Sequence, residues 1–153
     1  MKKIVVGADH GGFRLKEEVK SYLEQKGYSV KDVGTHSVER CDYPVTACAA
    51  AQEVSSGRYG RAIIICKSGI GNSIVANKLP RVRAALCYNI MAARLSRRHN
   101  DSNVLVMGSL FVTRQQAKRI VSAWLSTEFE AGRHLKRLRQ IRKIEEGMRC
   151  PTK

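Results

Sequence analysis

The chain has 153 residues, of which 43% are hydrophobic and 27% are charged, a composition that excludes a disordered chain and a membrane-spanning one. A chain of this length can form a single domain over residues 1–153 whose hydrophobic core is stable without disulfide bonds or bound metal. The 28 Lys and Arg against 13 Asp and Glu give a net charge of +15, which favours phosphorylated substrates or nucleic acid as partners.

The first predicted element is a strand at residues 3–7, where a β-branched run ends at glycine. Its apolar part, Ile4 to Val6, is too short for a signal peptide, and no apolar stretch of the sequence could span a bilayer. Together these features predict a cytoplasmic protein. An amphipathic stretch at residues 13–26 closes at Gly27, a favourable residue just past a helix end, and predicts the first helix.

The same strand and helix unit recurs along the rest of the chain. Further strands are predicted at residues 29–33, 61–65, 82–86 and 103–107, and further helices at 44–55, 72–78, 90–98, 114–126 and 132–147. The strands are apolar without a period-two pattern, which is typical of a parallel sheet buried on both faces. The sequence therefore predicts an α/β three-layer sandwich with a five-stranded parallel sheet and a basic C-terminal helix.

Glycine-containing turns follow the first three predicted strands, at residues 7–12, 34–35 and 66–72. All three are expected to open on one edge, because ligands bind beyond the carboxyl ends of the strands in such sheets. The third turn, CKSGIGN, has two glycines that let backbone N–H groups face an anion at the start of a helix. It matches neither a Walker A loop nor a GxGxxG fingerprint, and it predicts an anion cradle.

Cys66 lies where the third strand meets this cradle. The field of the helix N-terminus and the charge of Lys67 are expected to lower the pKa of the thiol towards a reactive thiolate. The alternative is an inert core cysteine, and the position beside an anion cradle favours the reactive one. The cysteines are odd in number and lack CxxC or Cys/His ligand spacing, which disfavours disulfides and a zinc site. They are Cys41, Cys48, Cys66, Cys87 and Cys150.

Five other side chains are candidates for the same chemistry. Asp9 and His10 follow the first strand and supply an acceptor carboxylate and a group that can carry charge near neutral pH, unless they only cap the next helix. His99 lies in the polar run RRHND, where a solvated loop histidine is the default expectation. Arg133 and Arg137 share one face of the last helix and suit a phosphate dianion, although a solvated basic face is the stronger alternative there.

Several long motifs in register resemble those of type B ribose-5-phosphate isomerases, which share a fold with galactose-6-phosphate isomerase subunits. They are GADHGG, GTHSVERCDYP, CKSGIGNSIVANK, RAALC, LSRRHNDSNVLVMGS and EAGRH followed by Arg137, and the match extends to about Glu146. The resemblance implies a Rossmann-like homodimer, often paired into tetramers, with active sites built between two subunits. It also implies interconversion of ribose 5-phosphate and ribulose 5-phosphate through a cis-enediolate, with no metal and no nucleotide cofactor.

The resemblance implies a role for each matched residue. Cys66 is the base that moves the proton between C2 and C1, with Ser68 hydrogen-bonding the same region. His99 is the acid that opens the furanose ring, and Asp9 and Asn100 position sugar hydroxyls. The backbone of residues 67–71 stabilises the enediolate oxygen, His10, Arg133 and Arg137 bind the phosphate, and Tyr43 lines the substrate pocket. The full set expected to bind substrate is Asp9, His10, Tyr43, Lys67, Ser68, Gly69, Ile70, Gly71, Asn100, Arg133 and Arg137.

The sequence departs from the family pattern in three places. Lys67 stands where the family commonly has glycine, Leu110 stands where several members place arginine, and the tail from residue 136 to 153 is unusually basic. The first two departures keep a six-carbon substrate open, either allose or galactose 6-phosphate. A non-catalytic protein that binds nucleic acid or another polyanion is a further alternative, disfavoured because 3 Phe, 5 Tyr and 1 Trp supply few stacking side chains. The last alternative is a sensor that binds a sugar phosphate without turning it over.

Overall fold

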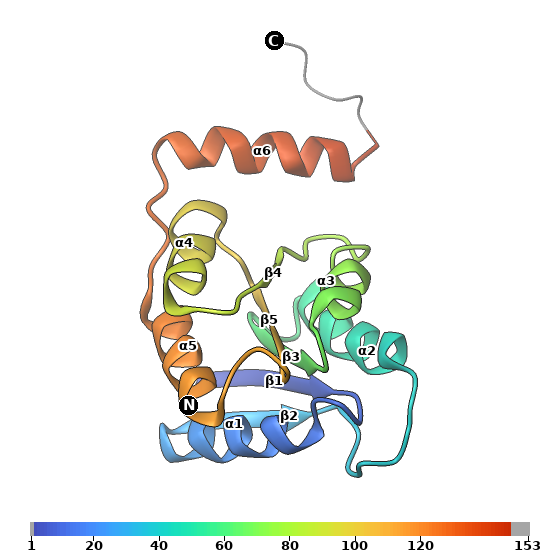
Figure 1. Ribbon diagram of the computed structural model, residues 1–153. Helices are drawn as coiled ribbons and strands as arrows, with labels where there is room; N and C mark the ends of the chain where they lie inside the picture. Colours follow the sequence, from blue (N-terminus) through green and yellow to red (C-terminus); the bar gives the residue numbers. More distant parts are fainter. Residues whose placement is uncertain (1, 148–153) are drawn as a thin grey trace.

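The computed structural model describes residues 2–147, so the last part of the basic tail, 148–153 with Cys150, lies outside the described residues. Its five strands form one sheet in the order β2-β1-β3-β5-β4, and every neighbouring pair is parallel (Figure 1). The strands are β1 (Lys2–Ala8), β2 (Tyr28–Asp32), β3 (Ala62–Cys66), β4 (Ala84–Leu86) and β5 (Val104–Gly108). The predicted five-stranded parallel sheet is confirmed.

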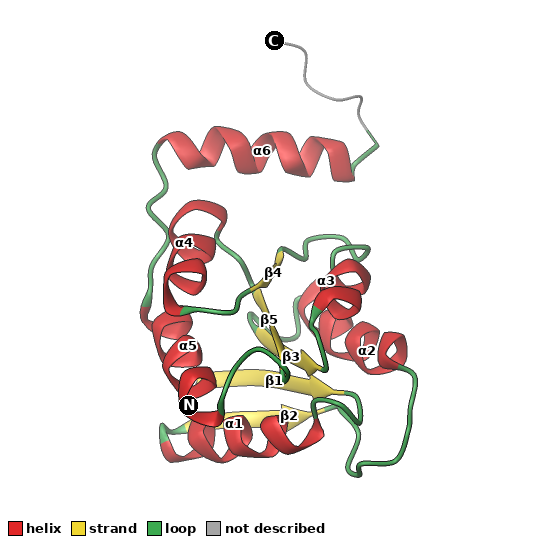
Figure 2. Cartoon of the chain, viewed as in Figure 1, coloured by secondary structure: helices red, strands yellow, loops and turns green. Residues whose placement is uncertain are grey.

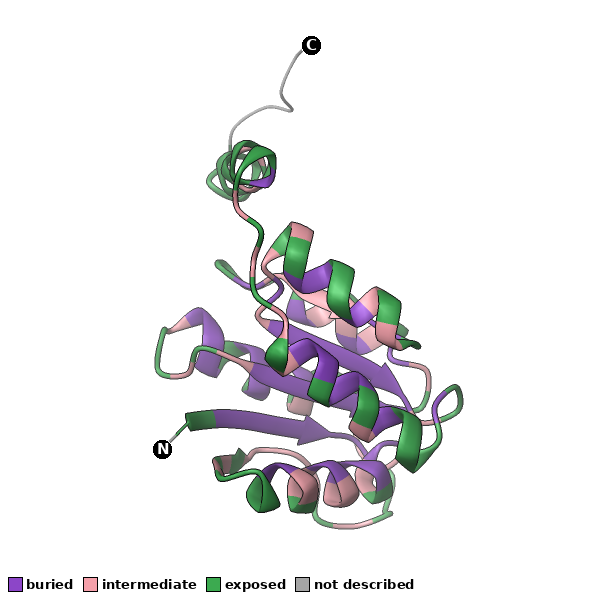
Figure 3. Ribbon diagram, turned by 90° about the vertical axis from the view of Figure 1, so that its left-hand side faces the viewer, coloured by how far each residue is buried: buried purple, intermediate pink, exposed green. Residues whose placement is uncertain are grey.

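Helices cover both faces of the sheet, as predicted (Figure 2). They are α1 (Phe13–Gln25), α2 (Tyr43–Ser55), α3 (Ile70–Ala76), α4 (Ile90–Asn100), α5 (Arg114–Ser126) and α6 (Arg133–Glu145). Alternate residues of β1 show how the sheet separates two cores, because Ile4 and Val6 pack with α1, α4 and α5, whereas Val5 packs with α2 and α3. β3 and β5 are buried along their length, and β1 is buried from Ile4 onwards (Figure 3). Every helix in residues 2–147 is too short or too polar to cross a membrane.

Most predicted boundaries are displaced by one or two residues, and three of these differences concern α3, β4 and α4. The third helix begins at Ile70, two residues early, because the left-handed Gly69 (φ +83°) turns the chain directly into it. β4 begins at Ala84 because Arg81 also has a left-handed backbone (φ +65°). The prediction of a loop at His99 is wrong, because α4 continues to Asn100 and places His99 in its last turn.

α6 lies beyond α4, at the end of the molecule opposite β2 (Figures 1 and 3). Of its residues, His134 is buried, whereas the apolar Leu135, Ile141 and Ile144 stay exposed. These apolar side chains face two grooves of about 520 and 630 Å³ that run between α6 and the β4 edge of the sheet. The apolar stripe of this helix is therefore largely uncovered in a single chain.

Candidate active site

The three glycine-containing turns meet at the carboxyl edge of the sheet, as the sequence predicts. The backbone N–H of Thr35 donates to the carbonyl of Ala8 over 2.9 Å and joins the second turn to the end of β1. The hydroxyl of Ser109, just after β5, donates to the carbonyl of Gly11 over 2.7 Å. The crevice lies between β1 and β3, where the chain order reverses across the sheet, which is the usual ligand site in such folds.

Close backbone packing explains the glycines at this edge. A Cβ on Gly12 would lie 2.2 Å from the carbonyl oxygen of Ile65, and one on Gly108 would lie 2.3 Å from the carbonyl oxygen of Ser68. A Cβ on Gly71 would lie 2.6 Å from the ring of Tyr43, so the tyrosine packs against the start of α3. Tyr43 therefore borders the cradle.

Cys66 is 5% exposed at the end of β3, with its sulfur facing into the cradle. The backbone N–H of Gly69 donates to this sulfur over 3.0 Å. Burial raises the pKa of the Cys66 thiol, and the Asp9 carboxylate raises it further, against a lowering by backbone N–H groups of Gly69, Ser68 and Asn72. The expectation of a lowered pKa is wrong, because loss of solvation outweighs the field of the helix N-terminus. The thiol form therefore dominates near neutral pH.

Asp9 and His10 occupy the turn opposite Cys66. Asp9 is 6% exposed, and its Oδ1 accepts the N–H of Gly12 over 3.0 Å, so it fixes the turn before α1. His10 Nδ1 accepts the N–H of Cys41 over 3.3 Å, which leaves its other ring nitrogen for a ligand. Asp9 therefore helps to cap the start of α1, which was the alternative to a role in the site, and its charge also acts on the Cys66 thiol.

The cradle is already partly occupied by its own side chains. The N–H of Gly69 is used by the sulfur, and that of Ile70 donates to Ser68 Oγ over 3.3 Å. The Tyr88 hydroxyl donates to the Ser68 carbonyl over 2.9 Å and holds the loop from outside, a contact that no sequence pattern signals. Lys67 and Leu110, the two departures from the family pattern, are neighbours, because the N–H of Leu110 donates to the Lys67 carbonyl over 3.0 Å.

The other predicted site residues lie at the opposite edge of the sheet. α4 starts beside the cradle and runs back towards the start of β5, and the ten residues from Ile90 to His99 span roughly 14 Å along the helix axis. Asn100 ends this helix, and Arg133 and Arg137 are exposed on α6 next to it. A single chain does not bring this second group to Cys66.

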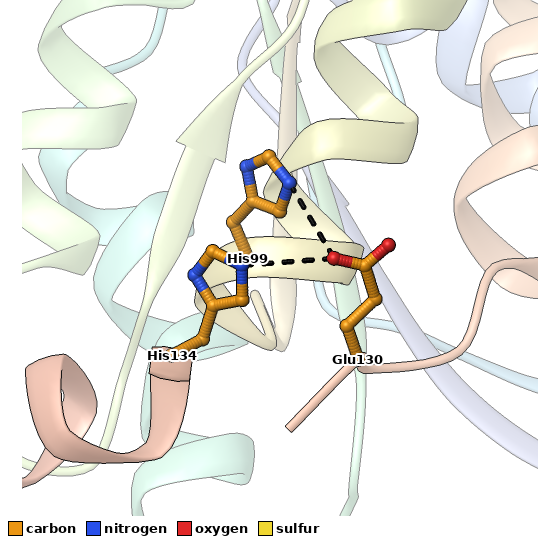
Figure 4. A group of neighbouring side chains, drawn as sticks. All are labelled: His99, Glu130 and His134. Carbon is orange, nitrogen blue, oxygen red and sulfur yellow. Dashed lines mark ion pairs between the residues drawn. The ribbon is translucent and has the colours of Figure 1, made fainter. Parts of the chain in front are cut away.

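His99 belongs to a cluster with Glu130 and His134 (Figure 4). Their donor atoms lie within 4.8 Å of one another, a set that resembles a His₂Glu metal site. The two imidazole rings, however, stack with centroids 4.4 Å apart and planes 12° apart. Lone pairs in two parallel planes do not converge on one ion, so the arrangement as it stands suits proton binding better than metal binding.

Comparison with known proteins gives matches along nearly the whole chain. A family model described as Ribose/Galactose Isomerase matches residues 4–141. Ribose-5-phosphate isomerase B of Escherichia coli is 47% identical over 146 residues, which cover 95% of this chain and 98% of that protein.

Solved structures agree with the sequence comparison. Ribose-5-phosphate isomerase B of Clostridium thermocellum aligns with a TM-score of 0.93 at 47% identity, covering 95% of this chain and 98% of that one. The Mycoplasma genitalium enzyme of the same name, solved with bound ribulose-5-phosphate, aligns with a TM-score of 0.92 at 34% identity, covering 95% and 97%. The likeness therefore includes both edges of the sheet and most of the C-terminal helix.

Proposed function

Because this chain belongs to the ribose/galactose isomerase family, we propose that it interconverts ribose 5-phosphate and ribulose 5-phosphate. The observation that carries the proposal is Cys66, which is buried beside an acidic residue and a glycine-rich turn at the β1/β3 crevice. The reaction is an intramolecular oxidoreduction and belongs to carbohydrate metabolism, within the pentose phosphate pathway. We also place the protein in the cytoplasm, because phosphorylated sugars are charged and are therefore retained there.

The proton transfer begins from the open-chain aldose. The Cys66 thiolate takes the proton from C2, the electron pair forms the C1–C2 double bond, and the carbonyl oxygen at C1 gains charge as a cis-enediolate. The thiol then returns a proton to C1, the hydroxyl proton of O2 passes to O1, and the oxygen at C2 becomes the ketone. Backbone N–H groups of residues 67–71 and the Ser68 hydroxyl stabilise the charged oxygen, and Asp9 orients the sugar hydroxyls. A raised thiol pKa makes the thiolate scarce but strongly basic.

The second group of residues reaches the cradle only from another chain. In a homodimer, His99 and Asn100 of one subunit would complete the cradle of its partner, with Arg133 and Arg137 on α6 and His10 in the cradle binding the phosphate. Two observations support this arrangement: the roughly 14 Å of α4 that lie between its start beside the cradle and His99 within one chain, and the uncovered apolar stripe of α6 above its two grooves. A tetramer would be a pair of such dimers.

Mixed variants test the shared site. Cys66→Ala and His99→Ala are each expected to inactivate the homodimer. After the two are refolded together, half of the dimers are hybrids with one intact site, and about one quarter of wild-type turnover returns. Zero recovery, with hybrid dimers present by mass spectrometry, would place both residues in one subunit's site and refute the proposal.

Substrate choice is tested with purified protein and a chelator present. We expect turnover of ribose 5-phosphate to exceed that of allose 6-phosphate and galactose 6-phosphate, and to vanish in Cys66→Ala. Turnover of a hexose phosphate alone would move the assignment to a six-carbon sugar. No turnover of any of the three, together with salt-sensitive binding of RNA or DNA, would favour the polyanion-binding alternative.

A further inference from the structure

The linker between α5 and α6 carries an acidic residue that the reaction above does not use. Glu130 lies in this linker, and Figure 4 shows its carboxylate pointing to two imidazoles from different helices. Its Oε2 lies 3.7 Å from His99 Nε2 and 3.6 Å from His134 Nε2. These are ion-pair distances whenever an imidazole is protonated. The proposed ring-opening acid is therefore in contact with a carboxylate.

Both oxygens of Glu130 have defined neighbours. Arg98 binds Oε1 through Nε at 2.7 Å and through a second guanidinium nitrogen, so only Oε2 faces the histidines. The backbone N–H of Glu130 also donates to the carbonyl of Arg98 over 3.0 Å. Contact with Arg98 holds the pKa of Glu130 below its usual range, with both histidines adding to the effect, so the carboxylate is ionised at neutral pH. It is fixed in place relative to the end of α4.

His134 closes the other side of the cluster. It is 3% exposed, and its Nε2 has no hydrogen-bond partner among the described residues. Burial lowers the pKa of His134, and the charges of His99, Arg133 and Arg137 lower it further, so this ring is neutral near pH 7. Its face stacks on His99 with centroids 4.4 Å apart. The neutral ring therefore restricts the rotation of its neighbour.

We propose that Glu130 is a positioning residue for His99, holding its Nε2 so that Nδ1 faces the ring oxygen of the sugar, with His134 fixing the plane of the imidazole. This inference rests on the proposed function. In the step that it serves, the C1–O4 bond of the furanose breaks, O4 receives the bonding pair and a proton from His99, and the C1 hydroxyl loses its proton to water to give the aldehyde. Glu130 and His134 take no proton in this step.

The test separates ring opening from enolisation. Ribulose 5-phosphate has no furanose form, because its O5 carries the phosphate, so exchange of its C1 hydrogen with D₂O requires Cys66 but no ring-opening acid. We expect Glu130→Gln to lower kcat on ribose 5-phosphate about 10- to 100-fold, the cost of a misplaced acid. Hydrogen exchange at C1, followed by NMR, and the KM for ribulose 5-phosphate are expected to stay within about twofold of wild type.

A matched control comes from the same linker. Glu128 is exposed two residues away and makes no ion pair within residues 2–147. Glu128→Gln is expected to leave both rates unchanged. Equal losses of turnover and exchange in Glu130→Gln would mean that Glu130 only anchors α6, and unchanged turnover would mean that it has no role; either result overturns the inference. Wild-type protein without turnover or exchange would instead refute the proposed function.

Discussion

Gly12 offers a direct test of how the backbone positions the proposed base. Its own conformation (φ −100°, ψ −10°) suits any residue, so Gly12→Ala introduces no backbone strain. The added Cβ would lie 2.2 Å from the Ile65 carbonyl oxygen and 2.9 Å from the backbone nitrogen of Cys66. Since ordinary Cβ contacts begin near 3.4 Å, the turn after β1 and the end of β3 must separate by about 1 Å.

The expected magnitudes follow from this displacement. Overpacking of this kind costs about 1–3 kcal/mol in the free energy of unfolding. A shift of about 1 Å between Cys66 and the rest of the site costs roughly 100-fold in kcat. The loss of activity should therefore exceed what the fraction of unfolded protein explains.

Urea denaturation and steady-state turnover of ribose 5-phosphate measure the two effects on one preparation. Gly60→Ala is the control, because nothing lies within 4 Å of its added Cβ and its φ is not left-handed, so both quantities should stay near wild type. Wild-type kcat in folded Gly12→Ala would show that the contact between the β1 turn and β3 does not set the position of Cys66. An equal loss in Gly60→Ala would show that the effect is not local.

Three further predictions rest on charged and buried groups. The rate of alkylation of Cys66 by iodoacetamide should keep rising at pH values above the ordinary thiol range. Asp9→Asn should shift this pH profile to lower pH, because the substitution removes a charge that opposes the thiolate. An unshifted profile would contradict this prediction. Two cationic partners hold the pKa of Glu53 at about 2, so its stabilisation is complete above the unfolded value of 4.5 and is lost as pH falls towards 2. Glu53→Gln should therefore cost about 1 kcal/mol at pH 7 and nothing near pH 2 in urea titrations, the partners being partly exposed. Lys16 is fully buried with its Nζ 2.6 Å from the Asp32 carboxylate. Lys16→Met should lower the free energy of unfolding by about 3 kcal/mol in the same urea titrations. An unchanged midpoint would mean that the Asp32 carboxylate is satisfied without Lys16.

Local signals in the sequence determined the elements and the turns between them. Short apolar runs predicted all five strands to within two residues, and the glycines after three of them marked the edge where the site lies. Apolar periodicity placed the helix at residues 114–126 to the residue, because a Thr113 capping box starts it sharply. Motifs in register then pointed to the family, which the comparisons show.

Tertiary structure alone decided how the site is assembled and charged. The pKa of Cys66 depends on burial and on Asp9, fifty-seven positions earlier in the chain, and neither is visible in the local motif that predicted a lowered value. The clustering of Glu130 with His99 depends on how the linker after α5 passes the end of α4. The separation of His99 from Cys66 follows from the direction of α4, because a helix between parallel strands must run back to the opposite edge. Local sequence determines which residues are available, and long-range packing determines which of them meet.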